Sequence, residues 1–532
     1  MPASQNNRTY KVWEPTLLAL CTIVGLLAGS QLFKQPSGTS PGLQTTKQDK
    51  GRELNEIVRF IEEKYVDEVN TDALISSAVS ALLKDLDPHS GYLSPAEVRE
   101  LNEKMEGHFE GIGIEFQRVL DTAIVLYVNP GGPADKSGLR MFDRIISAND
   151  SLLISPTLTE KDMISVLRNS KESKVKLEIV RPGVDSLITV SMERAEIPLK
   201  SVDGAYMIQP DIGYIRINRF SAKTYKEFMD HLEHLVQKQK MRDLIIDVRQ
   251  NPGGYLKEAV NILSQLFEEK GLLLVYTEGD NAPRAEYHTT GNPFYPVSNI
   301  VVLVDEGSAS ASEILAGSLQ DHDRGVIIGT PTYGKGLVQE QYALSNGGAL
   351  RLTVARYYTP SGRLIQKPYT NGDSVSEYER ESGDTAQYYT TRGREVNGSG
   401  GITPDILIRQ DFDWNDKRFS QLYKDVLEYA IHGYHENSVY QSLEDLMLRF
   451  PPKEELAEDL IQYYKTQNRA DHPIDATFIA DNNGYVRTML MGMVSTAHFG
   501  HDSWFKIMNV EDPVMQKALE VIKDDRKTTL KY

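Results

Sequence analysis

Short apolar runs alternate with helix-type patterns through the middle of the chain. The runs have the length and β-branched content of buried strands, and the stretches between them repeat apolar residues at helical spacing. The predicted strands are residues 212–217, 243–248, 272–276 and 300–304, and the predicted helices are residues 224–239 and 253–266. Strands and helices that alternate in this way favour an α/β core with a mostly parallel sheet. We place this core at residues 198–411.

The segments on either side of this core have different patterns. Residues 52–107 carry a helical stripe and should form an N-terminal helical region, whereas residues 108–197 are rich in short strand patterns. Beyond the core, residues 412–532 should form a helical C-terminal extension that ends in a basic-acidic tail. The helix patterns of this extension cover residues 419–430, 439–448 and 454–464. It contains no chemical motif, so its role as an oligomerisation or substrate-capture module stays open, and a homo-oligomer is one of the alternatives.

The first residues carry the one membrane signal. Arg8 and Lys11 precede an apolar run at residues 17–33, and about 17 residues is at the short end for a spanning helix. The same run fits a signal peptide, with residues 28–30 as a loose cleavage site. We favour an uncleaved signal anchor over residues 1–34, followed by a flexible linker over residues 35–51. The bulk of the chain would then lie outside the cytoplasm, on the periplasmic face of the inner membrane, or be secreted after cleavage.

Composition narrows the chemistry. With 58 basic and 75 acidic residues the net charge is −17, which argues against nucleic acid or an anionic membrane surface as the main partner. Cys21 is the only cysteine, so there can be no intrachain disulfide and no cysteine catalysis in the soluble part. His498 and His501 lack a third ligand, and we expect no metal and no cofactor.

Ser310 is the first candidate for chemistry. It lies where the predicted strand 300–304 passes through a turn into a helix, close to the positive end of the helix dipole. Such a place supplies free N–H groups and favours an oxyanion. Ser310 and Glu313 also fit the S-x-x-E capping box, so the local pattern alone favours a capping serine. We nevertheless read Ser310 as a nucleophile and Lys335 as its general base.

Lys335 has a competing interpretation as part of a phosphate-binding loop. Residues 329–335 match G-x-x-x-x-G-K after an apolar run. That motif needs Ser or Thr next, where this chain has Gly336, and it needs a helix, where residues 337–344 have a strand pattern. The nucleotide-binding interpretation is therefore weak.

Two segments resemble one known family. The sequence GSASASEILAGSLQD, followed by YGKGLVQ, resembles the serine/lysine centre of the C-terminal processing (tail-specific) peptidases. The resemblance covers residues 53–405 with gaps. It implies that Ser310 is the nucleophile, that Lys335 is the base and that Gln339 orients the lysine. It also overturns the purely capping interpretation of Ser310.

The resemblance extends to DVRQNPGGYLKEAV, which supplies one oxyanion donor in the family. It implies a donor N–H at Gly253 or Gly254, with a second at Ala311 beside the nucleophile. The alternative is that the glycines only form a tight turn between a strand and a helix, and this is compatible with the oxyanion role. The segment LDPHSGYLSP is similar to the family's N-terminal helical region. Because the family's base is a lysine, we interpret His89 as structural, and His322 likewise.

The β-rich unit resembles a PDZ domain. It opens with FEGIGIEF, and the resemblance implies that Gly111, Ile112, Gly113 and Ile114 present backbone N–H groups to a terminal carboxylate, while the peptide adds as a strand. The alternative is a glycine-broken strand without a ligand. The sequence Met141-Phe142-Asp143 departs from the family's usual Gly-Asp turn, which puts the geometry of this turn in doubt.

The expected function follows from both resemblances. It is a serine endopeptidase that recognises free C-termini of protein or peptide substrates through the PDZ domain and cleaves them through an acyl-enzyme. A lysine base needs a pKa well below its usual value near 10.4, which burial can provide. The alternative is a catalytically silent PDZ-type binding or scaffold protein. The intact Ser310, Lys335 and Gln339 favour the enzyme.

Overall fold

The computed structural model describes most of the chain from residue 49 onwards. The described ranges are residues 49–119, 121–149, 151–168, 173–368, 370–371, 374–375, 386–398, 400–409, 416–433, 440–466 and 474–529. Within them, no helix combines the length and the apolar character that crossing a membrane requires. The predicted anchor, residues 1–34, lies outside the described residues.

The chain divides into two compact units, Met1–Ala78 and Val79–Tyr532. The described part of the first unit contains α2 (Asp49–Lys64) and the first half of α3 (Thr71–Lys84). In the second unit, the short strand β1 (Gly91–Leu93) and α4 (Pro95–Glu106) follow. Ser94 and Glu97 form a capping box at the start of α4.

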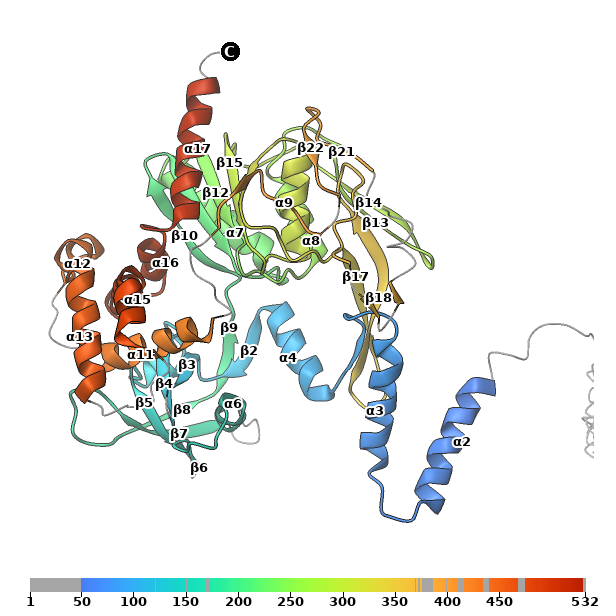
Figure 1. The fold of residues 1–532 in the computed structure, drawn as a ribbon, viewed down its shortest axis with the longest axis horizontal. Helices are drawn as coiled ribbons and strands as arrows, with labels where there is room; N and C mark the ends of the chain where they lie inside the picture. Colours follow the sequence, from blue (N-terminus) through green and yellow to red (C-terminus); the bar gives the residue numbers. More distant parts are fainter. Residues whose placement is uncertain are drawn as a thin grey trace, which may run out of the picture. The chain divides into compact units, whose positions relative to one another are not determined.

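A six-stranded sheet is the centre of the second unit (Figure 1). Its order is β10 (Val202–Gln209), β11 (Ile212–Ile217), β12 (Asp243–Asp247), β15 (Ile300–Val304), β16 (Val326–Gly329) and β23 (Ile406–Leu407). β10 and β11 pair antiparallel and the other neighbours pair parallel. Every residue of β12 and β15 is buried, as expected for parallel strands that are covered on both faces.

A second core sheet is antiparallel and holds the segment after Lys335. It comprises β13 (Leu273–Gly279), β14 (Ala282–His288), β17 (Leu337–Ala343) and β18 (Ala349–Tyr358), and β1 joins it beside β18. Strand pairing across the whole core is therefore mixed, whereas the sequence pattern led us to expect a mostly parallel arrangement. The antiparallel pairing brings the N-terminal segment of residues 87–93 next to β18.

Helices cover both faces of the parallel sheet. One face packs against α7 (Thr224–Glu233), the π-helical turn η1 (His234–Lys238), α8 (Leu256–Ser264) and α9 (Ala311–Asp321). All residues of α9 are buried, so it is a helix enclosed on every side. The opposite face packs against α16 (Asp502–Met508) and α17 (Pro513–Thr529), and α17 lies along the sheet in Figure 1.

The C-terminal extension thus has two parts. The first part packs on the outer face of the β-rich unit, around Val119, Ile124 and Phe142. Its helices are α11 (Lys417–Gly433), α12 (Leu443–Arg449), α13 (Lys453–Thr466), α14 (Ala476–Asp481) and α15 (Asn483–Phe499). The second part, α16 and α17, packs on the six-stranded sheet and completes its core. The segment predicted as a basic-acidic tail contains α17, which has an apolar face towards the sheet.

The β-rich unit is an antiparallel sheet with two short helices. Its order is β3 (Ile114–Val119), β4 (Thr122–Val128), β5 (Arg144–Ala148), β7 (Lys174–Val180) and β8 (Ile188–Glu193), with β6 (Ser151–Leu152) beside β5. The helices are α5 (Pro133–Lys136) and α6 (Glu160–Leu167). β2 (His108–Gly111) and β9 (Ala195–Pro198) pair where the chain enters and leaves the unit. β3 is an edge strand, so one side of it is free to accept another strand.

The role of α17 in the core can be tested by truncating one buried side chain. Ile522 is fully buried against the sheet, and Ile522→Ala should lower the free energy of unfolding by about 2–5 kcal/mol. Lys523→Ala changes the exposed neighbour on the same helix and should have almost no effect. Thermal and denaturant unfolding of the full chain measures both; equal stability of the two variants would show that α17 does not contribute to the core.

Candidate active site

Ser310 lies between β15 and α9 in a strained backbone conformation. Its φ of 54° and ψ of −112° are unusual for a residue with a side chain. The neighbouring serines are fully buried and committed: Ser308 Oγ donates to the Val248 carbonyl at 2.8 Å, and Ser312 Oγ donates to the Asn251 carbonyl at 2.9 Å. Ser310 is only half-buried, so it is the one serine of the three that a substrate can reach.

Glu313 connects Ser310 to the segment that carries Lys335. The predicted capping box forms, and the Ser310 N–H donates to Glu313 Oε2 at 2.8 Å. The same oxygen accepts the Lys335 N–H at 2.9 Å. Glu313 Oε1 accepts the Thr332 hydroxyl at 2.6 Å and the Gly334 N–H at 2.7 Å. This fully buried carboxylate therefore holds the backbone of Ser310 and the backbone of Lys335 at once.

Tyr357 makes the complementary connection through the carbonyl groups. Its hydroxyl contacts the carbonyl oxygen of Ser310 at 3.2 Å and also that of Lys335. The side chain is almost fully buried, and burial raises the pKa of Tyr357 well above its ordinary value, so the hydroxyl keeps its proton and can donate. The N–H and the carbonyl of both Ser310 and Lys335 are thus fixed by two buried side chains.

The electrostatics of Lys335 suit a base. Burial lowers the pKa of Lys335, and the Arg351 charge lowers it further, while the Glu313 and Asp87 carboxylates oppose the shift. Among the hydrogen bonds of the described residues, none joins the Lys335 amine to the Ser310 hydroxyl. Gln339 lies on β17, and its amide donates to Thr353 Oγ1 at 3.4 Å, so in this arrangement it does not hold the lysine.

The loop after β12 packs directly against the turn that carries Ser310. A Cβ on Gly253 would lie 2.7 Å from Ser310 Cβ and 2.9 Å from the Ala311 nitrogen, and Gly253 has a φ of 95°, so only glycine fits. The Gly253 N–H already donates to Asn251 Oδ1 at 2.8 Å. The sequence left open whether Gly253 or Gly254 supplies the oxyanion donor. Of these two, Gly254 is the one whose N–H does not donate to Asn251.

Two further contacts hold this loop to the turn that carries Ser310. Gln250 donates from its backbone N–H and from its amide to Asp305, both at 2.8 Å. The Asn251 carbonyl accepts the Ala309 N–H at 2.9 Å. Gln250 has a φ of 58°, so strained residues lie on both sides of the contact.

His89 comes closer to the site than the sequence interpretation implied. Strand pairing places its segment beside β18, and the Arg351 guanidinium donates to the His89 carbonyl at 3.0 Å. Burial lowers the pKa of His89, and the positive charge of Lys335 lowers it further. His322 is structural as expected, because its ring nitrogen contacts the Leu273 carbonyl at 2.7 Å. Within the described residues, no His, Cys, Asp or Glu cluster could hold a metal ion.

The loop of Gly111, Ile112, Gly113 and Ile114 connects β2 to the edge strand β3. The Ile112 carbonyl accepts the Ala134 N–H at 3.0 Å, and the Gly113 carbonyl accepts the Asn129 N–H at 2.9 Å. These contacts fix the loop through its oxygens. The doubtful turn at Phe142 keeps a left-handed conformation, with a φ of 69°, although the residue is not glycine.

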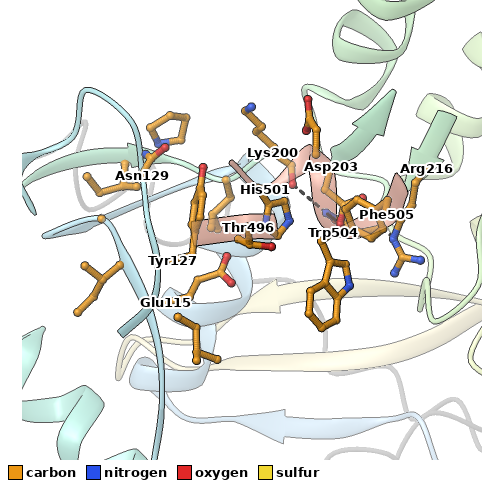
Figure 2. A pocket seen from close by; sticks show the side chains of 18 of the residues that line it. Glu115, Tyr127, Asn129, Lys200, Asp203, Arg216, Thr496, His501, Trp504 and Phe505 are labelled. Carbon is orange, nitrogen blue, oxygen red and sulfur yellow. Dashed lines mark hydrogen bonds and ion pairs between the residues drawn. The ribbon is translucent and has the colours of Figure 1, made fainter. Parts of the chain in front are cut away.

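A cavity of about 730 Å³ connects this loop region to the loop after β12, residues 248–254, which we call the catalytic loop because of its candidate role. Figure 2 shows its walls, with Glu115 and Tyr127 from the β-rich unit, Thr496 and Trp504 from the C-terminal extension, and Arg216 from the parallel sheet. Gly113 and Pro252 also line it. The cavity therefore extends from the edge-strand loop to the residue preceding Gly253, and its volume is in the range of small-ligand sites.

Comparison with known proteins identifies the family. A profile of peptidase family S41 matches residues 211–376, and one of the PDZ domain matches residues 111–192. A carboxy-terminal-processing protease of Bartonella bacilliformis is 30% identical over 412 residues, which cover 75% of this chain and 93% of that protein. The chain belongs to the carboxy-terminal processing proteases of peptidase family S41. It is thus a serine-type peptidase with a PDZ domain.

Two other relatives of this carboxy-terminal processing protease are of interest. The processing protease CtpB of Bacillus subtilis is 32% identical over 355 residues, covering 64% of this chain and 72% of CtpB. Among solved structures, a photosystem II D1 C-terminal processing protease is 28% identical, covers 66% of this chain and 86% of its own, and has a TM-score of 0.35.

Several residues at the site of this protease come from segments far apart in the sequence, and the sequence pattern did not reveal them. Glu313 was predicted only as a capping partner, and no role was predicted for Tyr357, Arg351 or Asp87. The S-x-x-E pattern could have pointed to Glu313. The carboxylate of a buried capping residue can accept more hydrogen bonds than the cap itself supplies, so further donors must lie near it. Tyr357 lies in a strand and has no local signal.

Replacing Glu313 tests its positioning role in the protease. Glu313→Gln leaves one oxygen and introduces an NH₂ group, so at least two of the four donors lose their acceptor, at about 1–3 kcal/mol each. We expect a lower melting temperature and at least a tenfold lower kcat in peptide hydrolysis. Glu306→Gln is the matched control, because Glu306 is exposed and accepts only a surface hydroxyl, that of Thr330 at 2.9 Å. An unchanged kcat in Glu313→Gln would contradict the role.

Proposed function

We propose that this protease cleaves peptide bonds through an acyl-enzyme formed by Ser310, with Lys335 as the general base. The observation that carries this proposal is the Glu313 carboxylate, which binds the backbone N–H groups of both residues. It fixes the accessible serine and the lysine of lowered pKa relative to each other. Nucleophilic catalysis needs such an arrangement of nucleophile and base.

The reaction would proceed in two steps. Neutral Lys335 accepts the hydroxyl proton of Ser310 while Oγ attacks the substrate carbonyl, and the lysine then gives this proton to the departing amine. A water molecule, deprotonated by the same amine, then attacks the ester carbonyl; the bond to Ser310 Oγ breaks, and the lysine returns the proton to this oxygen. The Ala311 N–H at the start of α9 and an N–H of the adjacent Gly253–Gly254 turn would stabilise the oxyanion. If Gly253 is the donor, its N–H must first leave Asn251.

Gln339 would orient the lysine in the working enzyme. Its amide lies on the strand that follows Lys335 and contacts Thr353 through a long, weak hydrogen bond of 3.4 Å. Breaking such a bond costs little, so the amide can turn towards the amine when substrate is bound.

The PDZ domain would capture the free C-terminus of a protein substrate. β3 is an edge strand of its sheet, so a substrate tail can add to it as a further strand, with its carboxylate at the N–H groups of Ile112, Gly113 and Ile114. The cavity that extends from Gly113 to Pro252 gives the tail a path towards Ser310. The positive residues before the apolar run at residues 17–33 support an anchored, extracytoplasmic enzyme.

The Ser/Lys dyad is tested by cleavage of an unfolded, apolar-tailed protein by the full chain. Ser310→Ala and Lys335→Ala should each lower kcat/KM by at least about 10³-fold, and the intact chain should gain activity with rising pH as Lys335 loses its proton. Ser345→Ala and Lys367→Ala, both exposed, are the controls. If the intact chain binds the protein without cutting it, the molecule is a PDZ-type binding protein. If Ser310→Ala still cuts, the nucleophile is another residue.

Tail recognition is tested with a pair of peptides that differ only at the C-terminus. The inactive Ser310→Ala chain should bind a free carboxylate at least tenfold more tightly than the amide, because hydrogen bonds to a charged group are worth about 1.5–3 kcal/mol. Gly113→Ala should remove this preference. Gly138→Ala is the control, since Gly138 shares the φ of 81° but has open space around it. Equal binding of acid and amide would exclude carboxylate capture.

A further inference from the structure

The loop between α16 and α17 contacts the catalytic loop through one carboxylate. Asp512 Oδ2 lies 2.6 Å from Arg249 Nη1, and both side chains are only 11% exposed. Arg249 lies two residues after the end of β12 and four residues before Gly253. The C-terminal extension therefore reaches the segment that carries the oxyanion glycines.

Arg249 is held on its other side by the sheet. Its Nη2 lies 2.7 Å from Asp247 Oδ2, and its backbone N–H donates to Asp247 Oδ1 at 3.0 Å. Asp247 is fully buried at the end of β12. The guanidinium thus bridges a carboxylate of the sheet and a carboxylate of the extension, and planar donors of this kind fix geometry on both sides.

The network of charged side chains that begins with Asp512, Arg249 and Asp247 continues to the cavity. Arg216 lies 3.9 Å from Asp247 and 3.3 Å from Asp203, and its guanidinium stacks 5.0 Å from the ring centre of Phe505 on α16. Figure 2 shows Asp203, Arg216 and Phe505 together at the cavity wall. The extension therefore contacts this network at both ends, through Phe505 on Arg216 and through Asp512 on Arg249.

Removing Asp512 would leave the Arg249 guanidinium with one carboxylate instead of two in a largely dry site. A buried charge that loses a partner moves towards other acceptors or water. The backbone of Arg249 leads directly into Gln250, which has a positive φ of 58° and donates to Asp305. A shift of Arg249 would therefore displace the loop that packs on Ser310.

We propose that Asp512 is a positioning residue for the catalytic loop, which it holds through Arg249, so that the C-terminal extension completes the active site. This inference rests on the proposed Ser310–Lys335 mechanism. Asp512 does not touch the reacting atoms. It acts by keeping the oxyanion donors of the Gly253–Gly254 turn in register with Ser310, and small displacements of such donors are costly for the rate.

The substitution Asp512→Asn removes the negative charge that faces Arg249 but can keep the side-chain oxygen that caps α17. Asp512 Oδ1 also accepts the Val514 N–H at 2.9 Å and caps α17, and an asparagine oxygen can keep this cap. The matched control is Glu520→Gln, which removes an acidic group from an exposed ion pair with Lys517 on the same helix. Asp512→Glu restores the charge at a slightly longer reach.

In the full chain, Asp512→Asn should lower kcat at least tenfold and change KM less than twofold, with a melting temperature close to that of Glu520→Gln. The rate at which a serine-reactive phosphonate modifies Ser310 should fall in parallel, and Asp512→Glu should recover part of both rates. In an Arg249→Gln background, Asp512→Asn should cause no further loss, because both changes remove the same interaction.

Several outcomes would overturn the proposal. Full activity of Asp512→Asn beside an inactive Ser310→Ala would refute it while leaving the proposed function intact. A loss of activity that follows a large drop in melting temperature would assign Asp512 a structural role only. Additive losses with Arg249→Gln would show that Asp512 does not act through Arg249. If the unmodified chain does not cleave, the proposed function itself fails.

Discussion

The parallel sheet, buried on both faces, is the constraint on which the rest of this protease depends. Parallel strands end at the same edge of a sheet, so the loops after β12 and β15 meet there. One loop supplies Gly253 and Gly254 and the other supplies Ser310. Their contact requires the sheet to stay rigid, and strands without exposed residues need helices on both faces. Among the described residues, the helices before residue 411 pack on one face, and α16 and α17 cover the other.

Two buried side chains, Glu313 and Tyr357, fix the positions of Ser310 and Lys335 where these loops meet, and burying the Glu313 carboxylate costs stability. Glu313 gains four hydrogen bonds but lies out of water, so burial raises the pKa of Glu313 to about 7 in spite of them. Since the pKa in the folded state exceeds the ordinary value of 4.5, its contribution to stability is present below pH 4.5 and is lost as the pH rises through about 7. Near neutrality, the carboxylate is retained for positioning at the expense of stability.

Local patterns predicted the strands at residues 212–217, 243–248 and 300–304 and several helices, and they offered Ser310 and Lys335 as candidates, whereas the roles of these two residues and of Gly111 to Ile114 came from the resemblance to known families. Each of these has a signal within a few residues, such as a strand that passes into a capped helix. Tyr357, Arg351 and the pairing of Arg249 with Asp512 have no such signal, because their partners lie tens to hundreds of residues away and only the fold joins them. The same holds for the choice between Gly253 and Gly254, which depends on where the Asn251 side chain turns. One signal was available: β12 and β15 are apolar at every central position, which implies a cover on both faces and hence a structural role for the C-terminal segment.

Phe142 shows how a departure from a family pattern can carry structural information. A left-handed backbone costs a residue with a side chain about 1–2 kcal/mol relative to glycine, yet burying a phenylalanine side chain returns about 1.5–3 kcal/mol. Phe142 is 3% exposed and packs in one cluster with α11 and α15. The burial therefore outweighs the strain only when the C-terminal extension is present. A glycine suffices for a PDZ turn that faces solvent, whereas this turn has a partner. The extension is thus anchored at the PDZ domain by Phe142 and at the catalytic loop by Asp512, and it connects the element proposed to bind the substrate tail with the one proposed to cleave it.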